Sequence, residues 1–121
     1  MISEICLIRH GETDWNYLGK LQGRTDIPLN RNGINQARQC GKFLASGNWD
    51  LIVTSPLQRA KQTAEIIRSL IDIPIFEMAD FLERDYGDAE GMTVKERTAA
   101  FPDKNYPNQE NKNSLNKRVV M

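Results

Sequence analysis

Apolar residues recur along the chain with two periods, and these predict alternating strands and helices. Continuous apolar runs at residues 5–8 and 51–54 are typical of strands buried on both faces of a parallel sheet. A third short strand is predicted at residues 73–76, where Pro74 marks the beginning of the strand or an edge position. Between these runs the apolar spacing is three and four residues, which indicates helices.

Two amphipathic helices are predicted between the strands. The first follows an N-cap at Asn30 and ends near Gly47. Its apolar positions are Ile34, Ala37, Gly41 and Leu44. The second has Ser55 as N-cap and Pro56 at the first helical position. Its core-facing positions are Leu57, Ala60, Ala64, Ile67 and Ile71. The order strand, helix, strand, helix, strand predicts an α/β fold with a parallel sheet covered by helices.

The chain is less regular after residue 80. Residues 81–91 contain four acidic residues and two glycines, which is typical of a loop. A capping box at residues 93–96 predicts a short helix that ends near Phe101. Residues 103–113 are polar, and Ser114 is predicted to cap a last helix that breaks off soon after it begins.

Composition limits the classes of function. The 121 residues suit one domain, and 16 basic residues balance 16 acidic ones. This balance argues against non-specific binding to nucleic acid or a membrane surface. No apolar run approaches the roughly 20 residues that span a bilayer, so a soluble cytoplasmic protein is expected. Cys6 and Cys40 are interpreted as small buried hydrophobic residues, and His10 is the single histidine, which excludes a metal site with two histidines.

Three polar side chains are predicted to meet at the carboxyl end of the sheet. Arg9 and His10 follow the first strand, and Arg59 lies in the first turn of the second helix. Two guanidinium groups beside a helix N-terminus would bind phosphate, and a neutral imidazole there could attack phosphorus. A carboxyl group would be needed to protonate the leaving oxygen.

A purely structural interpretation of the same residues stays open at this point. A lone histidine after a strand is often a hydrogen-bonded structural residue, and Arg59 could be a solvated helix residue. The acidic side chains at 83, 85, 88 and 90 could form an exposed loop, and they offer too few regularly spaced ligands for a hard cation. Pattern alone therefore predicts an α/β domain with a candidate anion site.

Four ordered segments resemble the motifs of a known family. Residues 7–16 (LIRHGETDWN) resemble the LxRHGExxxN signature of the histidine phosphatase superfamily, in its phosphoglycerate mutase-like branch. Residues 23–29 (GRTDIPL) resemble its GxxDxPL segment, residues 55–64 (SPLQRAKQTA) its SPLxRAxQTA motif, and residues 82–91 (LERDYGDAEG) its LxExxxGxxEG motif. The motifs fall within residues 1–102 and occur in the family's order.

The resemblance implies a fold and a role for each site residue. The fold would be three-layered, with a mostly parallel sheet and helices on both faces. His10 would be the nucleophile that becomes phosphohistidine, and Glu83 would be the acid that protonates the leaving group and then activates water. The phosphoryl oxygens would be bound by Arg9 and Arg59, with two further pocket residues, Asn16 and Gly23. Members of the family use no metal or other cofactor.

The sequence also departs from the family pattern. The family has a second histidine on a later strand, and this chain has no histidine after His10. Residues 1–121 are therefore interpreted as one partial domain that lacks its C-terminal strand or strands, with 103–121 irregular and ending in a truncated helix. The implied missing strand lies between the first two strands seen here. A sound fold would then need self-association with a swapped partner chain through the incomplete sheet, a different strand pairing, or the missing C-terminal part.

Two classes of function follow. The first is a metal-independent phosphatase that hydrolyses small phosphate monoesters through phosphohistidine, with weak or absent activity in this chain; phosphoglycerate mutase-type phosphoryl transfer is the alternative chemistry. The second is a catalytically inactive remnant that binds anions. The compact segment between Glu12 and Pro28 and the sequence LERDYGDAEG favour the phosphatase.

Overall fold

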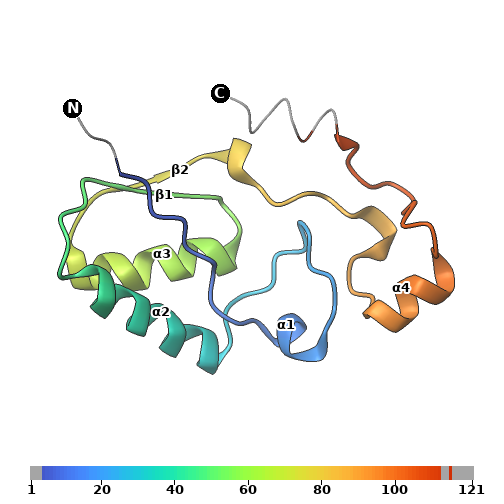
Figure 1. Ribbon diagram of the computed structural model, residues 1–121, viewed down its shortest axis with the longest axis horizontal. Coiled ribbons are helices and arrows are strands. Elements are labelled where there is room, and N and C mark those ends of the chain that lie inside the picture. The colour runs from blue at the N-terminus through green and yellow to red at the C-terminus, as the bar shows by residue number, and fades with distance from the viewer. Residues whose placement is uncertain (1–3, 113–114, 116–121) are drawn as a thin grey trace.

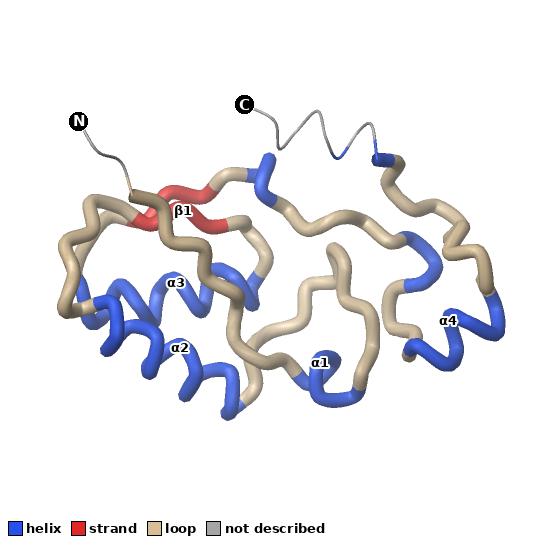
Figure 2. The backbone as a smooth tube through the Cα atoms, viewed as in Figure 1, coloured by secondary structure: helices blue, strands red, loops and turns tan. Residues whose placement is uncertain are grey.

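The computed structural model describes residues 4–112 and residue 115. Within these residues six helices and strands, with two 3-10 turns, follow one another (Figures 1 and 2). They are α1 (Asp14–Leu18), α2 (Arg31–Leu44), β1 (Ile52–Thr54), α3 (Gln58–Ile71), β2 (Ile75–Glu77), the turns Ala79–Phe81 and Gly87–Ala89, and α4 (Val94–Ala100). The helix start predicted at Ser114 lies outside the described residues.

The sheet of the described residues consists of β1 and β2, which pair in parallel. Ile52 lies opposite Ile75, and Thr54 lies opposite Glu77. Pro74 immediately precedes β2, and its carbonyl accepts a hydrogen bond from the Ile52 amide at 2.9 Å. The predicted strands at 51–54 and 73–76 are thus confirmed as a parallel pair, with Pro74 at the beginning because it has no N–H to donate.

Helix α2 follows the predicted pattern closely. The Asn30 side chain accepts a hydrogen bond from the Gly33 amide at 2.9 Å and so caps the helix. The predicted stripe is buried at Ala37, Gly41 and Leu44, and this face packs against α3. The α/β class is therefore confirmed, with α3 packed against both strands and α2 against α3.

The start of α3 differs from its prediction. The helix begins at Gln58, not after Ser55, and its N-cap Leu57 provides no side-chain hydrogen bond. The Asp26 carboxylate, 32 residues earlier in sequence, accepts the Gln58 amide at 2.7 Å instead. A remote carboxylate thus satisfies an N-terminal amide of the helix, which a local capping rule does not anticipate.

The predicted strand at 5–8 is not formed among the described residues. Ile5 is 86% exposed and Leu7 is 92% exposed, and Cys6 is exposed as well, which corrects its interpretation as a buried residue. A strand requires a hydrogen-bonded neighbour, and no described strand pairs with this segment. The apolar side chains of residues 5–8 are therefore exposed on the surface.

Helices on both faces of the sheet are also absent from the part of the chain that the structure describes. Figure 1 shows α2 and α3 on the same side of the strands. Val53 is 44% exposed and Phe76 is 54% exposed, so the sheet keeps an uncovered apolar face. The sequence expects self-association at this incomplete sheet, and that expectation stays a prediction.

The acidic segment after β2 is held by the polar segment beyond α4. The Asp88 amide donates to the Pro107 carbonyl at 2.8 Å, and the Glu110 amide donates to the Asp85 carbonyl at 2.7 Å. Both segments are irregular, as predicted, but backbone hydrogen bonds fix them against each other. The capping box at Thr93 is confirmed at the start of α4.

Candidate active site

The loop that carries His10 lies against the first turn of α2 because two glycines allow their backbones to meet. A Cβ at Gly11 would lie 2.3 Å from the Gly33 carbonyl oxygen, and a Cβ at Gly33 would lie 2.1 Å from the Glu12 carbonyl oxygen. The Gly11 amide also donates to the Thr63 hydroxyl at 3.0 Å, and this hydroxyl donates to the Arg59 carbonyl at 2.7 Å. Both helices therefore fix the position of the residue beside His10.

Replacing Gly33 by alanine is expected to destabilise the protein, although alanine ordinarily stabilises a helix by about 1 kcal/mol relative to glycine. The added methyl group would overlap backbone atoms of Glu12, and overpacking of this kind costs about 1–3 kcal/mol. Urea unfolding measures the effect. Asn32→Ala, at an exposed position in the same helical turn, is the control, and a stabilised Gly33→Ala variant would contradict the described contact.

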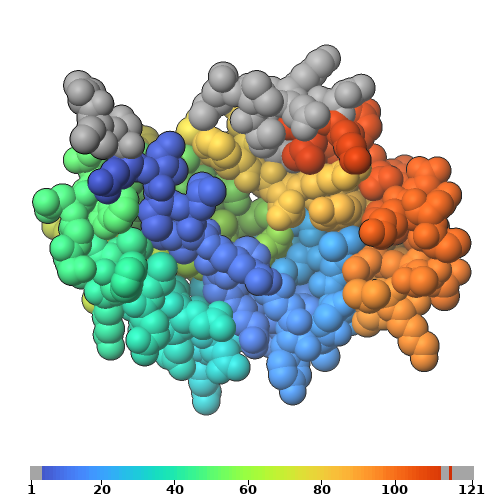
Figure 3. Space-filling view, viewed as in Figure 1, coloured from blue at the N-terminus to red at the C-terminus, as the bar shows by residue number. Residues whose placement is uncertain are grey.

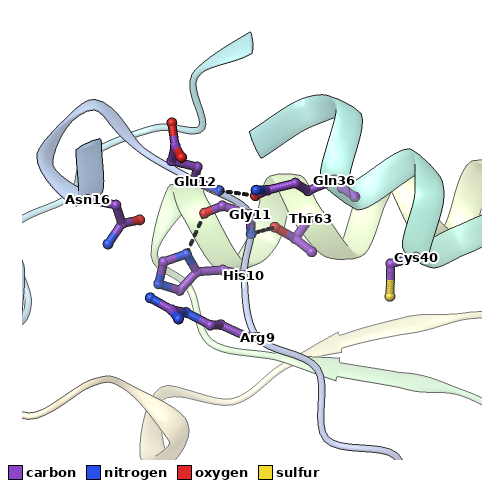
Figure 4. A pocket seen from close by; sticks show the side chains of 9 residues that line it. Arg9, His10, Gly11, Glu12, Asn16, Gln36, Cys40 and Thr63 are labelled. Carbon is purple, nitrogen blue, oxygen red and sulfur yellow. Dashed lines mark hydrogen bonds between the residues drawn. The ribbon is translucent and has the colours of Figure 1, made fainter. Parts of the chain in front are cut away.

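His10 is held in one tautomer by the backbone. Its Nδ1 lies 2.6 Å from the Gly11 carbonyl oxygen, and this oxygen can only accept, so Nδ1 carries the proton (Figure 4). In the neutral imidazole Nε2 then carries a lone pair. The ring is therefore oriented by Nδ1 and can react at Nε2.

The surroundings of His10 favour its neutral form. Burial lowers the pKa of the imidazole, and the positive charges of Arg59 and Arg9 lower it further. The hydrogen bond to Gly11 and the negative charge of Glu83 oppose this shift. Arg9, Arg59 and Glu83 therefore all lie within electrostatic range of the His10 ring, as the sequence predicts.

We expect His10 to titrate below its ordinary pKa of 6.5. Because the folded chain binds this proton less readily than the unfolded chain, the free energy of unfolding should fall as the pH drops through 6.5 towards the folded-state pKa. Proton NMR of the single imidazole measures the midpoint directly. The free energy of unfolding of His10→Ala should lack this part of the pH dependence. A titration midpoint of the wild-type imidazole at or above pH 6.5 would contradict the described environment.

A cavity of about 480 Å³ opens beside His10. In Figure 3 the dark blue N-terminal segment lies on the surface beside the teal residues of α2. The lining residues come from the loop after residue 8, from α1, from α2 and from α3: Arg9, His10, Gly11, Glu12, Asn16, Gln36, Ala37, Cys40 and Thr63. Cys40, predicted to be buried, is partly exposed here, and burial raises the pKa of its thiol.

Asn16 and Arg9 both contribute to this lining. The Asn16 side-chain oxygen accepts the Thr13 amide at 3.0 Å, so it caps α1 and leaves the amide nitrogen as a donor. Arg9 is exposed and lies on the same side of the cavity as His10 (Figure 4). Both residues can therefore offer N–H groups to an anion in the cavity.

Arg59 is 3% exposed, which rules out a solvated helix residue. Its Nη1 donates to the Thr25 carbonyl at 2.8 Å, and its Nη2 donates to the Gly23 carbonyl. Burial lowers the pKa of the guanidinium, and the negative charges of Glu83, Asp26 and Glu90 oppose this effect. These two carbonyls use two of the five N–H groups of the guanidinium, and Arg59 is not among the residues that line the cavity beside His10.

Gly23 and Glu83 occupy different positions from the cavity lining. Gly23 is buried with φ of +54° and provides the carbonyl that binds Arg59. Glu83 lies in the exposed segment after β2, where its carboxylate accepts the Arg84 amide at 2.8 Å. Its charge reaches both His10 and Arg59, so the structure brings this carboxyl group to the same region.

Sequence reasoning missed Thr63 and Glu90. Thr63 lies four residues after Arg59, on the same face of α3, and this helical spacing could have revealed it. Glu90 contacts the loop that holds Arg59, and nothing in its local sequence indicates that distant contact.

Two findings concern other classes of site. In residues 4–112 and 115, no group of three or more His, Cys, Asp and Glu side chains gathers as metal ligands. Within the same residues no helix is both long enough and apolar enough to cross a bilayer.

The family model described as histidine phosphatase superfamily (branch 1) matches residues 5–118. The chain belongs to this superfamily. Its relatives include the Bacillus subtilis protein named uncharacterized phosphatase PhoE, which is 56% identical over 119 residues, or 98% of this chain and 62% of that protein. A 2,3-bisphosphoglycerate-dependent phosphoglycerate mutase of Treponema pallidum is 35% identical over 103 residues, or 81% of this chain and 41% of the mutase.

The fold comparison agrees with this membership. The structure of Bacillus stearothermophilus YhfR superposes with a TM-score of 0.81 at 33% sequence identity, covering 91% of this chain and 60% of YhfR. The phosphoglycerate mutase-like fold predicted from the motifs is thus confirmed. The chain spans less than two thirds of the length of each of these relatives.

Proposed function

We propose that this chain catalyses metal-independent phosphatase chemistry on small phosphate monoesters, with His10 as the nucleophile. The observation that carries the proposal is the His10 ring itself. Its Nδ1 donates to the Gly11 carbonyl, which leaves the Nε2 lone pair available beside a cavity and within electrostatic range of Arg9 and Arg59. A neutral imidazole among guanidinium groups suits attack on an anionic phosphoryl group.

The proposed reaction has two steps. In the first, Nε2 of His10 forms a bond to phosphorus while the ester P–O bond breaks, and the leaving oxygen takes a proton from the Glu83 carboxyl. In the second, water attacks phosphorus, Glu83 takes a proton from it, and the Nε2–P bond breaks to release inorganic phosphate. Arg59, Arg9 and the Asn16 amide would bind the phosphoryl oxygens, and Gly23 would act through its carbonyl on Arg59.

Hydrolysis is favoured over transfer to a second metabolite because the phosphatase-named relative is 56% identical and the mutase 35%. The sequence contains one histidine, so the chain does not itself supply the second histidine of the family pattern. We therefore propose slow turnover, and we retain the cytoplasmic location that the sequence favours.

Phosphate release from p-nitrophenyl phosphate tests this function. The folded chain is expected to release phosphate slowly and at the same rate with and without EDTA. Addition of 3-phosphoglycerate separates the alternatives, because a mutase would transfer the phosphoryl group between phosphoglycerates and not to water. Orthovanadate binding without phosphate release would overturn the proposal in favour of an inactive anion-binding protein.

A further inference from the structure

We propose that Glu90 is a positioning residue that holds Arg59 in place through the loop at residues 23–25. This inference rests on the proposed function of the site. Glu90 is 31 residues after Arg59 in the sequence and does not line the cavity beside His10. Its effect on the site would therefore pass through the loop that lies between the two side chains.

The Glu90 carboxylate organises this loop through several hydrogen bonds. One oxygen accepts the Thr25 amide at 2.8 Å and also the Thr25 hydroxyl. The other oxygen accepts the Arg24 amide at 3.1 Å and the Tyr86 amide at 2.9 Å. Both oxygens are thus engaged by donors from two separate segments, and a carboxylate binds such donors more strongly than a neutral group does.

Gly23 makes this approach of the carboxylate possible. A Cβ at Gly23 would lie 2.3 Å from the Glu90 carboxylate oxygen, and the φ of +54° also favours glycine. Both the close approach of Glu90 and the positive φ therefore favour glycine at position 23. Gly23, the first residue of the motif at residues 23–29, thus allows both the contact with Glu90 and the turn of the backbone.

The other side of the same loop holds the arginine. The carbonyls of Gly23 and Thr25 accept the two Arg59 hydrogen bonds. Thr25 is therefore bound by both Glu90 and Arg59, and the Gly23 carbonyl belongs to the same peptide unit as the Arg24 amide that donates to Glu90. Without the carboxylate, the amides of residues 24 and 25 would lose their acceptor and the loop would shift. A small displacement of a group that orients the reacting phosphoryl costs up to about 100-fold in rate.

Glu90→Gln tests this directly, because it keeps the size of the side chain and replaces one acceptor oxygen by an NH₂ group that faces backbone amides. We expect about tenfold weaker orthovanadate binding and a slower formation of phosphohistidine from p-nitrophenyl phosphate. Asp88→Asn, in the same loop but exposed, is the matched control and should bind orthovanadate as the wild type does.

A double-mutant cycle separates positioning from general stabilisation. In an Arg59→Lys background, Glu90→Gln should weaken orthovanadate binding no further, because the group that it positions is already absent. An equal loss in both backgrounds, or wild-type binding by Glu90→Gln, would overturn the inference. If Glu90→Gln does not fold, Thr25→Val removes only the hydroxyl bond to Glu90, and its predicted intermediate loss of binding decides the question.

The readouts also distinguish this inference from the proposed function. A wild-type chain that binds orthovanadate but forms no phosphohistidine would overturn the proposed function, whereas the effect of Glu90→Gln on binding would still test the inference. Formation of phosphohistidine at equal rates in the wild type and Glu90→Gln would overturn the inference alone.

Discussion

Alanine at position 10 is expected to reduce phosphate release from p-nitrophenyl phosphate to the background rate of the buffer. His10 is the single histidine of the chain, so no other imidazole can replace its Nε2 as nucleophile. The loss should be complete and not partial, because removing a nucleophile removes the covalent route itself. A colorimetric phosphate assay in EDTA measures it.

The control for this variant must separate chemistry from folding. Arg68→Ala removes an exposed cation from α3 and should leave phosphate release unchanged. His10→Ala should unfold cooperatively in urea at pH 8, where the wild-type imidazole is neutral. Phosphate release by folded His10→Ala at the wild-type rate would show that another group attacks phosphorus.

Replacing Arg59 by alanine is expected to slow the formation of phosphohistidine by about 10³-fold or more. An arginine that stabilises the charge of a transferring phosphoryl group contributes about 10³–10⁵-fold to the rate. Arg59 is buried and held by two carbonyl contacts, so a fixed positive charge lies within electrostatic range of His10. Rapid-quench measurement of the first turnover reports this step.

Lysine at position 59 provides the matched comparison. It keeps the positive charge but cannot bind two carbonyls and two phosphoryl oxygens with one planar group. We expect Arg59→Lys to be faster than Arg59→Ala and far slower than the wild type. A lysine variant with the wild-type rate would show that charge alone, and not the geometry of the guanidinium, supports the reaction.

The elements governed by local spacing could be predicted from the sequence. Asn30 caps α2 as expected, and the buried positions of that helix are those of its apolar stripe. The pairing of β1 with β2 follows from two short apolar runs and the position of Pro74. The cap and the apolar stripe depend on neighbours within a few residues, and the parallel pairing follows from the order strand, helix, strand, so pattern is sufficient for them.

The features that depend on remote partners could not be predicted. Residues 5–8 are apolar enough for a buried strand, but strand formation requires a neighbouring strand that the described residues do not supply. Helix α3 starts at Gln58 because a carboxylate from residue 26 satisfies its first turn. Local propensity carries no information about either partner.

At the candidate site, too, some features could be predicted from the sequence and others depend on remote partners. The motifs identified His10, Arg9 and Arg59, and the structure gathers their charges around one ring. The tautomer of His10 and the role of the Gly23 carbonyl as hydrogen-bond acceptor for Arg59 depend on backbone geometry, which local sequence does not encode. In the sequence Glu90 is one of several acidic loop residues, and its contacts with residues 24 and 25 join segments far apart along the chain.

The position of the phosphoryl group on the protein tests the central claim most directly. The chain should be mixed with p-nitrophenyl phosphate, quenched in base, where phosphohistidine is retained, and digested for peptide mapping by mass spectrometry. The account predicts a phosphoryl group on His10 of the wild-type chain, lost on mild acid treatment and absent from His10→Ala. Phosphate release without phosphorylated His10, or a phosphoryl group on another residue, would contradict it.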